Sequence, residues 1–147
     1  MSIPITPLSN LEIVNMMSKN KKFKGCFAKD IIPTLKKGES CIINLNNHDE
    51  PGSHWTCLQR GKEYHYYDSY GAPPPQSVIK NIKKNTSMMN TYQAQSMKPG
   101  SVACGYYAMF TLDRLSKKDD FTRICYFFDN DLDQNSDYVV NYCRTQL

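Results

Sequence analysis

The residue types in the middle of the chain are those that a thiol acyl-transfer reaction needs. Cys104 stands at the start of an apolar run that favours a helix, where free backbone N–H groups and the helix dipole stabilise a thiolate. Gly105 follows it, and a residue without a side chain lets a substrate carbonyl approach the first backbone amides. A single cysteine of this kind is more often a buried structural thiol, so its assignment as a nucleophile depends on its partners.

A predicted β-hairpin supplies a base and an acid. The runs 54–59 and 63–67 are rich in aromatic residues and are separated by a short turn that contains Gly61. His54 begins the first strand and Asp68 follows the second, so antiparallel pairing brings the two side by side at one edge of the sheet. A carboxylate beside an imidazole fixes its tautomer and stabilises its charged form, which is what a general base requires.

A glutamine ahead of the nucleophile is a candidate oxyanion donor. Gln95 ends a short predicted strand that leads into the loop before Cys104. Its side-chain amide can therefore point at a tetrahedral intermediate together with the Cys104 backbone N–H. Gln93 lies two residues earlier, on the same face of the strand, and is the alternative. A polar loop glutamine without a catalytic role is the simpler interpretation of either residue.

Local patterns predict the first elements that hold these residues. Ser9 and Glu12 have the spacing of a capping box at the start of a helix over residues 9–19. The short β-branched run 39–45 favours a buried strand ahead of the hairpin. After the hairpin, Pro75 suits the first turn of a second helix.

Three more elements complete the expected fold. A short strand is expected near residues 90–95, and the run 104–115 is apolar on nearly all sides, which predicts a long buried helix. Ser136 is a natural cap for a last helix near residues 136–144. This order indicates an α+β fold with a small mixed or antiparallel sheet packed around a central buried helix that starts at the cysteine. With 147 residues, we expect one domain spanning residues 1–147.

Composition excludes several classes of protein. The six cysteines are far apart and have apolar neighbours, so we expect reduced thiols and not a disulfide framework. No apolar run is long enough to span a membrane, and the start of the chain has no secretory pattern, so we expect a protein that is not secreted. His54 and Cys57 are the best metal-like pair, and they supply only two of the four ligands of a zinc site. No metal site is therefore expected.

Charge is unevenly distributed along the chain, whose formal net charge is +4. Residues 1–118 hold 16 Lys and Arg against 8 Asp and Glu, whereas residues 119–147 hold 2 against 6. A basic body can track a polyanion such as DNA, although dispersed lysines usually serve only solvation. The strongest candidates for DNA contact are four lysines at the end of the first predicted helix: Lys19, Lys21, Lys22 and Lys24.

Four segments carry the candidate residues in the order His, Asp, Gln, Cys. They are Pro51-Gly52-Ser53-His54-Trp55, Tyr66-Tyr67-Asp68-Ser69-Tyr70-Gly71, Gln93-Ala94-Gln95 and Ser101-Val102-Ala103-Cys104-Gly105-Tyr106-Tyr107. Together they resemble the adenovirus-type maturation proteases, adenain and its relatives, and more distantly the SUMO-specific proteases of the same clan. The resemblance implies His54 as base, Asp68 as its orienting acid, Cys104 as nucleophile and Gln95 as oxyanion donor, with Trp55 and Gly105 at the substrate groove.

This resemblance also implies a function. It indicates a cysteine endopeptidase that cleaves viral capsid or core precursor proteins during virion maturation, after small residues such as Gly-Gly or Gly-X. It implies a monomer in the virion and the infected host cell that needs no cofactor for its chemistry, and it leaves activation by DNA or a viral peptide open. The alternatives are a SUMO or ubiquitin-like-protein isopeptidase, an acetyltransferase, and a basic DNA- or capsid-associated structural protein that is not an enzyme.

Overall fold

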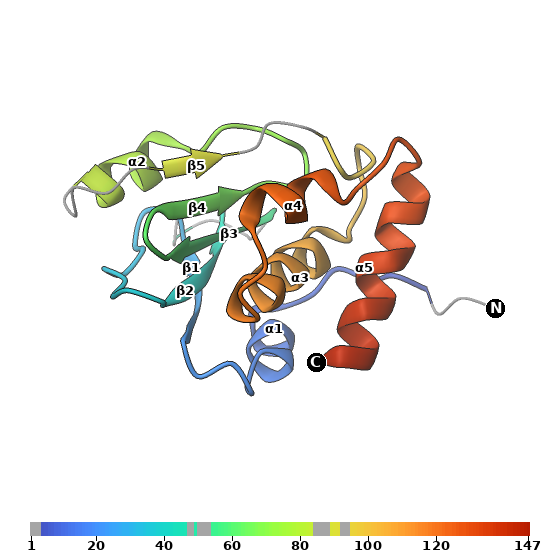
Figure 1. Cartoon of the computed structure of the whole chain (residues 1–147), viewed down its shortest axis with the longest axis horizontal. Helices are drawn as coiled ribbons and strands as arrows, with labels where there is room; N and C mark the ends of the chain where they lie inside the picture. The colour runs from blue at the N-terminus through green and yellow to red at the C-terminus, as the bar shows by residue number, and fades with distance from the viewer. Residues whose placement is uncertain (1–3, 47–48, 50–53, 84–88, 92–94) are drawn as a thin grey trace.

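The structure combines one mixed β-sheet with helices that cover both of its faces (Figure 1). It is a computed structural model that describes residues 4–46, 49, 54–83, 89–91 and 95–147. In the described part of the chain, no helix is long and apolar enough to cross a bilayer. The predicted α+β class, with a mixed sheet beside a buried helix, is confirmed.

Five strands form the sheet in chain order: β1 (Phe23–Ala28), β2 (Ser40–Asn44), β3 (Trp55–Arg60), β4 (Tyr64–Tyr67) and β5 (Met89–Thr91). β1 is parallel to β2 and β4 is parallel to β5, whereas β2, β3 and β4 pair antiparallel. β2, β3 and β4 lie within one residue of their predicted bounds. β5 begins one residue before the predicted 90–95, and residues 92–94 of that prediction lie outside the described part of the chain.

The sequence patterns do not predict β1. Most of its residues are half-buried, so it lacks the alternation of buried and exposed positions that marks a strand. Its register against β2 shifts between Phe23 and Cys26, and Gly25 between them has a φ of 120°. A glycine in this conformation is typical of a bulge, which interrupts the strand pattern.

Among the described residues, five helices pack around the sheet: α1 (Asn10–Met16), α2 (Gln76–Lys83), α3 (Cys104–Ser116), α4 (Phe121–Tyr126) and α5 (Leu132–Gln146). In Figure 1, α2 lies beside the sheet at the end away from α5, and α3 lies between the sheet and α5. α3 starts at Cys104, as predicted, and is buried along nearly its whole length. It is therefore the central helix on which the other elements pack.

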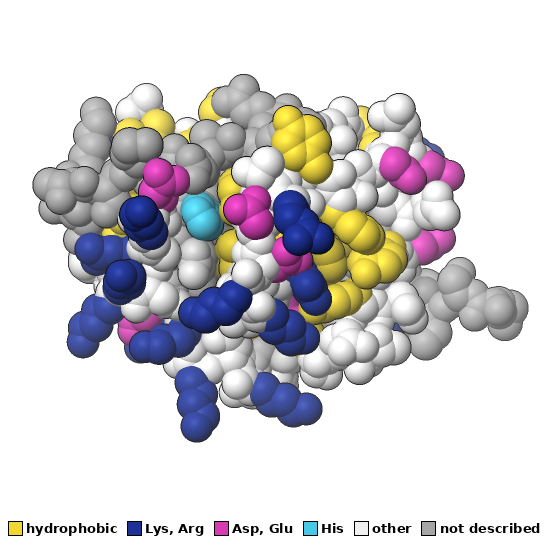
Figure 2. All heavy atoms as spheres, in the orientation of Figure 1, with side chains coloured by type: hydrophobic (Ala, Val, Ile, Leu, Met, Phe, Trp, Pro, Cys, Tyr) yellow, Lys and Arg dark blue, Asp and Glu magenta, His cyan; other side chains and the backbone are white. Residues whose placement is uncertain are grey.

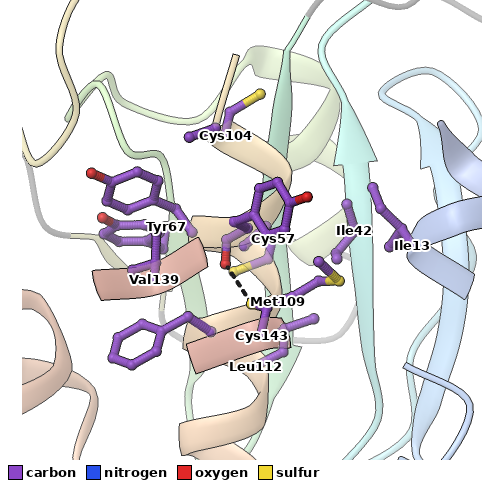
Figure 3. Packing of buried hydrophobic residues seen from close by; sticks show 14 of the residues in the cluster. Ile13, Ile42, Cys57, Tyr67, Cys104, Met109, Leu112, Val139 and Cys143 are labelled. Carbon is purple, nitrogen blue, oxygen red and sulfur yellow. Dashed lines mark hydrogen bonds between the residues drawn. The ribbon is translucent and has the colours of Figure 1, made fainter. Parts of the chain in front are cut away.

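The sheet is buried on both faces, which explains the continuous apolar run of β2. Ile42 and Cys57 pack with α1, α3 and α5 in one core cluster. Their neighbours Cys41, Ile43 and Leu58 pack with α2 in a second cluster. Figure 3 shows the first cluster around Cys57 and Met109, with apolar side chains from α3 and α5 meeting those of the sheet.

The first helix has the predicted capping box but ends earlier than expected. The Ser9 hydroxyl accepts the N–H of Glu12 at 3.2 Å, and the Glu12 carboxylate accepts the N–H of Ser9 at 3.0 Å. The helix ends at Met16, so placing the four lysines at its end was wrong. Lys24 lies instead in β1 and forms an ion pair of 3.5 Å with Glu39. Figure 2 shows that many Lys and Arg side chains gather on the left and lower parts of the face in view, with a few acidic side chains among them.

The last two helices differ from the sequence prediction. α4 was not predicted, because six residues are too few for a clear periodic pattern. α5 begins at Leu132 and is capped by Asp131, so the prediction that Ser136 caps it was wrong. Ser136 is buried in the helix interior, where its hydroxyl lies 2.9 Å from the hydroxyl of Tyr107. A serine can satisfy a buried tyrosine in this way as readily as it can cap a helix.

Candidate active site

Cys104 lies at the first residue of α3, at the edge of the core. Figure 3 shows its sulfur pointing away from Cys57 and Cys143, which lie inside the cluster. The cap residue Ala103 gives the helix no side-chain cap, so in the described part of the chain the first backbone N–H groups are not occupied by a capping side chain. The N–H of Trp55 donates to the Cys104 Sγ at 3.5 Å. The sulfur therefore lies at a helix start with backbone N–H donors around it.

His54 and Asp68 meet at the open end of the β3–β4 hairpin. His54 immediately precedes β3, where its carbonyl accepts the N–H of Leu45, and Asp68 immediately follows β4. The His54 Nε2 lies 2.8 Å from the Asp68 Oδ1, and the two side chains are 12% and 2% exposed. With Nε2–H donating to the carboxylate, Nδ1 is left to accept a proton.

The electrostatics of His54 depend on both of its partners. Burial lowers the pKa of His54, but hydrogen bonds to Asp68 and Cys104 and the charges of both groups outweigh burial and raise the pKa to about 9. The imidazole is therefore held in its protonated form near neutral pH. The structure thus brings together the three residues that the sequence assigns as nucleophile, base and acid.

The turn after β4 fixes the Asp68 carboxylate. Its Oδ1 accepts the N–H of Tyr70 at 2.8 Å in addition to His54, and the Asp68 carbonyl accepts the N–H of Gly71 at 2.8 Å. Gly71 has a φ of 77°, in the region that favours glycine. An aspartate that bonds to the backbone two residues on is a common turn former, and here the same bond orients the acid.

Tyr70 belongs to the site, and the sequence reasoning missed it. Its ring stacks on the His54 ring with a centroid distance of 4.7 Å and an interplanar angle of 22°. The hairpin register contains the signal for this contact. β3 and β4 pair Cys57 with Tyr67, and continuing that register by three residues sets Tyr70 opposite His54.

The loop before α3 is anchored on the same turn. The Ser69 carbonyl accepts the N–H groups of Ser96 and Met97 at 2.9 and 3.0 Å. The Ser96 carbonyl in turn accepts the Tyr107 hydroxyl at 3.1 Å and the Asn135 side-chain amide at 3.0 Å. The turn, α3 and α5 thus hold the start of this loop from three sides.

The structure describes one of the two glutamines that the sequence offers as oxyanion donors. Gln95 is exposed, and its Nε2 donates to the Met97 carbonyl at 2.8 Å, so this donor is directed at the backbone of its own loop. Gln93 lies outside the described residues. The oxyanion role of Gln95 remains a prediction that requires its amide to turn away from Met97.

Trp55 and Gly105 pack against each other. A Cβ added at Gly105 would lie 3.2 Å from a methyl of Leu8 and 3.3 Å from the Trp55 ring, which is tighter than ordinary contact. The Trp55 indole N–H donates to the Leu8 carbonyl at 3.0 Å. The missing side chain at Gly105 is therefore explained by close packing of the N-terminal segment, and a substrate-binding role for either residue remains a prediction.

An open groove lies along the loop before the nucleophile. It has a volume of about 490 Å³, and one wall is the loop of residues 98–102 while another is the start of α5. Lys98 and Asp133 face each other there at 3.8 Å, but both are largely exposed, so the pair contributes little stability. The lining residues are Ile5, Lys98, Pro99, Gly100, Ser101, Val102, Asp133, Ser136 and Asp137.

The other five cysteines are free and lie in apolar surroundings. Burial raises the pKa of Cys26 and of Cys125 to about 12. It raises the pKa of Cys41, Cys57 and Cys143 further. Within the described residues, no group of three or more His, Cys, Asp and Glu side chains could hold a metal ion. Cys104 is the cysteine whose sulfur contributes to the raised pKa of His54.

Comparison with solved structures finds the same fold in a viral protease. A crystal structure of the ASFV pS273R protease aligns with a TM-score of 0.64 and 16% identity, over 90% of this chain and 66% of that chain. The Se-Met form of the same protease gives 0.59 and 17% over the same shares. The C-terminal Ulp1 protease domain, in complex with Smt3, the yeast ortholog of SUMO, gives 0.40 and 13% over 72% and 52%.

The alignments with the ASFV protease establish the fold and no more. The chain spans slightly less than two thirds of the length of the ASFV protease structures that it matches. No protein-family profile matches the sequence. No curated protein sequence is significantly similar to it.

Proposed function

We propose that residues 1–147 form a cysteine endopeptidase domain with Cys104 as nucleophile, His54 as base and Asp68 as the acid that orients the base. The observation that carries this proposal is the placement of His54, 2.8 Å from the Asp68 carboxylate and close enough to Cys104 for the sulfur to raise its pKa, at the uncapped start of α3. An activated cysteine next to an oriented imidazole is the arrangement that nucleophilic catalysis needs. A fold shared with a viral protease supports the same conclusion.

In the first half of the reaction, the Cys104 thiolate attacks the carbonyl carbon of the scissile peptide bond. The carbonyl oxygen becomes an oxyanion, which the uncapped N–H groups at the start of α3 stabilise. Protonated His54 gives its proton to the nitrogen of the leaving amine, the C–N bond breaks, and an acyl thioester remains on Cys104. Gln95 joins the oxyanion donors once its amide leaves the Met97 carbonyl.

In the second half, water replaces the amine. Neutral His54 takes a proton from water, and the resulting hydroxide attacks the thioester carbonyl. The C–S bond then breaks, the product leaves as a carboxylic acid, and the thiolate and protonated His54 are restored. Asp68 keeps the same nitrogen of His54 occupied throughout, so the other nitrogen faces the reaction.

For the substrate, we propose viral capsid or core precursor proteins cleaved after small residues such as Gly-Gly or Gly-X. The sequence motifs around His54 and Cys104 and the fold shared with the ASFV protease support this choice. DNA contact through Lys19, Lys21, Lys22 and Lys24 belongs to the same proposal, which makes no claim about activation by DNA or a peptide.

A fluorogenic peptide library tests the proposal. We expect the wild type to cleave peptides with Gly-Gly before the scissile bond, and Cys104→Ala to lower the rate by about 10⁴-fold or more. Because the thiolate works with protonated His54, activity should fall as pH rises through about 9. The matched control is Cys26→Ala, which removes a half-buried thiol whose pKa is raised to about 12 and should leave the rate unchanged.

Two outcomes would overturn parts of this proposal. Peptide cleavage that survives Cys104→Ala would exclude Cys104 as the nucleophile. Cleavage of SUMO or ubiquitin fusions that is much faster than cleavage of Gly-Gly peptides would replace the viral substrate with a ubiquitin-like one. A comparison of both substrate types at equal enzyme concentration decides between them.

A further inference from the structure

The Tyr70 side chain touches both halves of the site. On one side, its ring lies 4.7 Å from the His54 ring, nearly parallel to it, and its backbone N–H donates to the same Asp68 oxygen that faces His54. On the other side, its hydroxyl accepts the N–H of Gly100 at 3.2 Å. Gly100 belongs to the loop that leads into Cys104.

We infer that Tyr70 is a positioning residue that holds the base His54 in its productive orientation and ties it to the loop in front of Cys104. The inference rests on the proposed function and deepens it, because it names a residue that fixes the position of the base relative to the nucleophile. Tyr70 acts through His54 and through the loop.

The stacking contact should act on both the orientation and the charge of His54. A hydrogen bond from one nitrogen leaves the imidazole free to swing about that bond, and a ring stacked on its face opposes this motion. A protonated imidazole over a tyrosine face is also a cation–π pair, which favours the charged form. The charged or titratable groups that act on His54 here are Asp68 and Cys104, and Tyr70 adds a neutral π face to them.

Two hydrogen bonds connect the Tyr70 hydroxyl with the start of the helix that carries Cys104. Gly100 has a φ of 80°, a conformation that favours glycine and directs its N–H at the Tyr70 hydroxyl. One residue later, the Ser101 hydroxyl accepts the N–H of Ala103, which is the cap residue of α3. The loop therefore connects Tyr70 with the first turn of the helix that carries Cys104.

Two substitutions separate the roles of the ring and the hydroxyl. Tyr70→Phe keeps the stacked ring and removes only the acceptor for Gly100, whereas Tyr70→Leu also removes the aromatic face. The first readout is the rate of alkylation of Cys104 by iodoacetamide between pH 5 and pH 10, followed by mass spectrometry of the Cys104 peptide. The second readout is kcat and KM on the best library peptide.

The alkaline limb of the alkylation profile is the change in rate at high pH that follows deprotonation of His54. We expect Tyr70→Leu to shift this limb to lower pH by about half a unit, because the cation–π contact that stabilises protonated His54 is lost. Tyr70→Leu should also lower kcat by about 10- to 100-fold, because the base is displaced. KM should change little, because the substitution leaves the substrate groove unchanged. Tyr70→Phe should leave the alkaline limb in place and lower kcat by about threefold. Tyr126→Leu, on the exposed face of α4, is the control and should match the wild type.

The result that overturns the inference is an unshifted alkaline limb in Tyr70→Leu with kcat equal to that of Tyr70→Phe. Folding of each variant is checked by circular dichroism and thermal unfolding, and Tyr70→Met replaces Tyr70→Leu if the latter does not fold. The alkylation profile does not depend on any peptidase activity. If the wild type cleaves no peptide, the proposed function fails, and the pH shift still decides whether Tyr70 positions His54.

Discussion

His54 and His65 stand at opposite ends of the β3–β4 hairpin in similar surroundings. His54 immediately precedes β3, and His65 lies in β4, near the turn. Each imidazole is stacked on an aromatic ring at a centroid distance of 4.7 Å: His54 on Tyr70 and His65 on Phe121. Each is also partly buried. If burial and stacking alone set the pKa of a histidine, the two rings should have similar pKa values.

Their hydrogen-bond partners make them different. The pKa of His54 is raised to about 9 because Asp68 and Cys104 outweigh its burial. The pKa of His65 is lowered because burial dominates, with only small opposing effects from Glu63 and Asp120. The Nδ1 of His65 is buried with no hydrogen-bond partner in the described part of the chain. A carboxylate and a thiol within reach, and not an aromatic neighbour, distinguish a candidate base from a structural histidine.

The sharpest test of this difference replaces each histidine in turn. His54→Gln should lower kcat/KM on the Gly-Gly peptide by roughly 10⁴-fold, because the base and the proton donor are lost together. His65→Gln should leave kcat/KM within about twofold, because this ring contacts none of the reacting groups. Steady-state kinetics with both purified variants measures the effect. Equal losses in the two variants would contradict the assignment of His54 as the base.

A second test removes the partner that makes His54 different. Asp68→Asn should lower kcat by about 100-fold, less than loss of the base, because a thiol needs less help from a base than a hydroxyl does. The pKa of His54 should fall from about 9 towards 6.5, since the carboxylate no longer stabilises the charged ring. Titration of the histidine ring signals by NMR follows both His54 and His65. An unchanged pKa of His54 would show that Asp68 is not its main charged partner.

The same substitution has a consequence for stability. The pKa of His54 is raised in the folded state, so its stabilising contribution is fully present below about pH 6.5 and is lost as pH rises through about 9. The free energy of unfolding of the wild type should therefore fall over this range, and that of Asp68→Asn should fall less. Urea unfolding at pH 6.0, 7.5 and 9.5 measures both. If the free energy of unfolding fell equally with pH in the wild type and in Asp68→Asn, the link between the pKa of His54 and stability would be contradicted.

The smallest expected effect tests whether stacking alone matters. Phe121→Leu removes the ring on which His65 stacks and should raise the pKa of His65 slightly towards its usual value, because burial is relieved. Activity should stay within about twofold, and the free energy of unfolding should fall by about 1–2 kcal/mol, as is usual for truncation in a core. Ring titration by NMR and urea unfolding are the measurements. A fall in activity as large as that of Asp68→Asn would show that α4 supports the site.

The parts of the site predicted from sequence are those that local geometry dictates. An antiparallel hairpin with a short turn must bring the residues at its open end together, so the adjacency of His54 and Asp68 could be derived. The apolar run after Cys104 similarly dictated a buried helix. Tyr70 could have been found by continuing the hairpin register past β4. The hydrogen bond of Gln95 to Met97 could not have been predicted, because an exposed side chain has several orientations of nearly equal energy.

The sequence by itself determined the types and chain order of the candidate residues, the capping box at Ser9, the hairpin and the helix that starts at Cys104. These features depend on residues within a few positions of one another, where spacing and hydrogen-bonding capacity suffice. Only the tertiary structure decided that α3 packs its first turn against Trp55 and that Tyr70 connects His54 with the loop of Gly100. Such contacts join segments far apart in the chain, and burial in a shared core, which local patterns do not encode, sets their geometry.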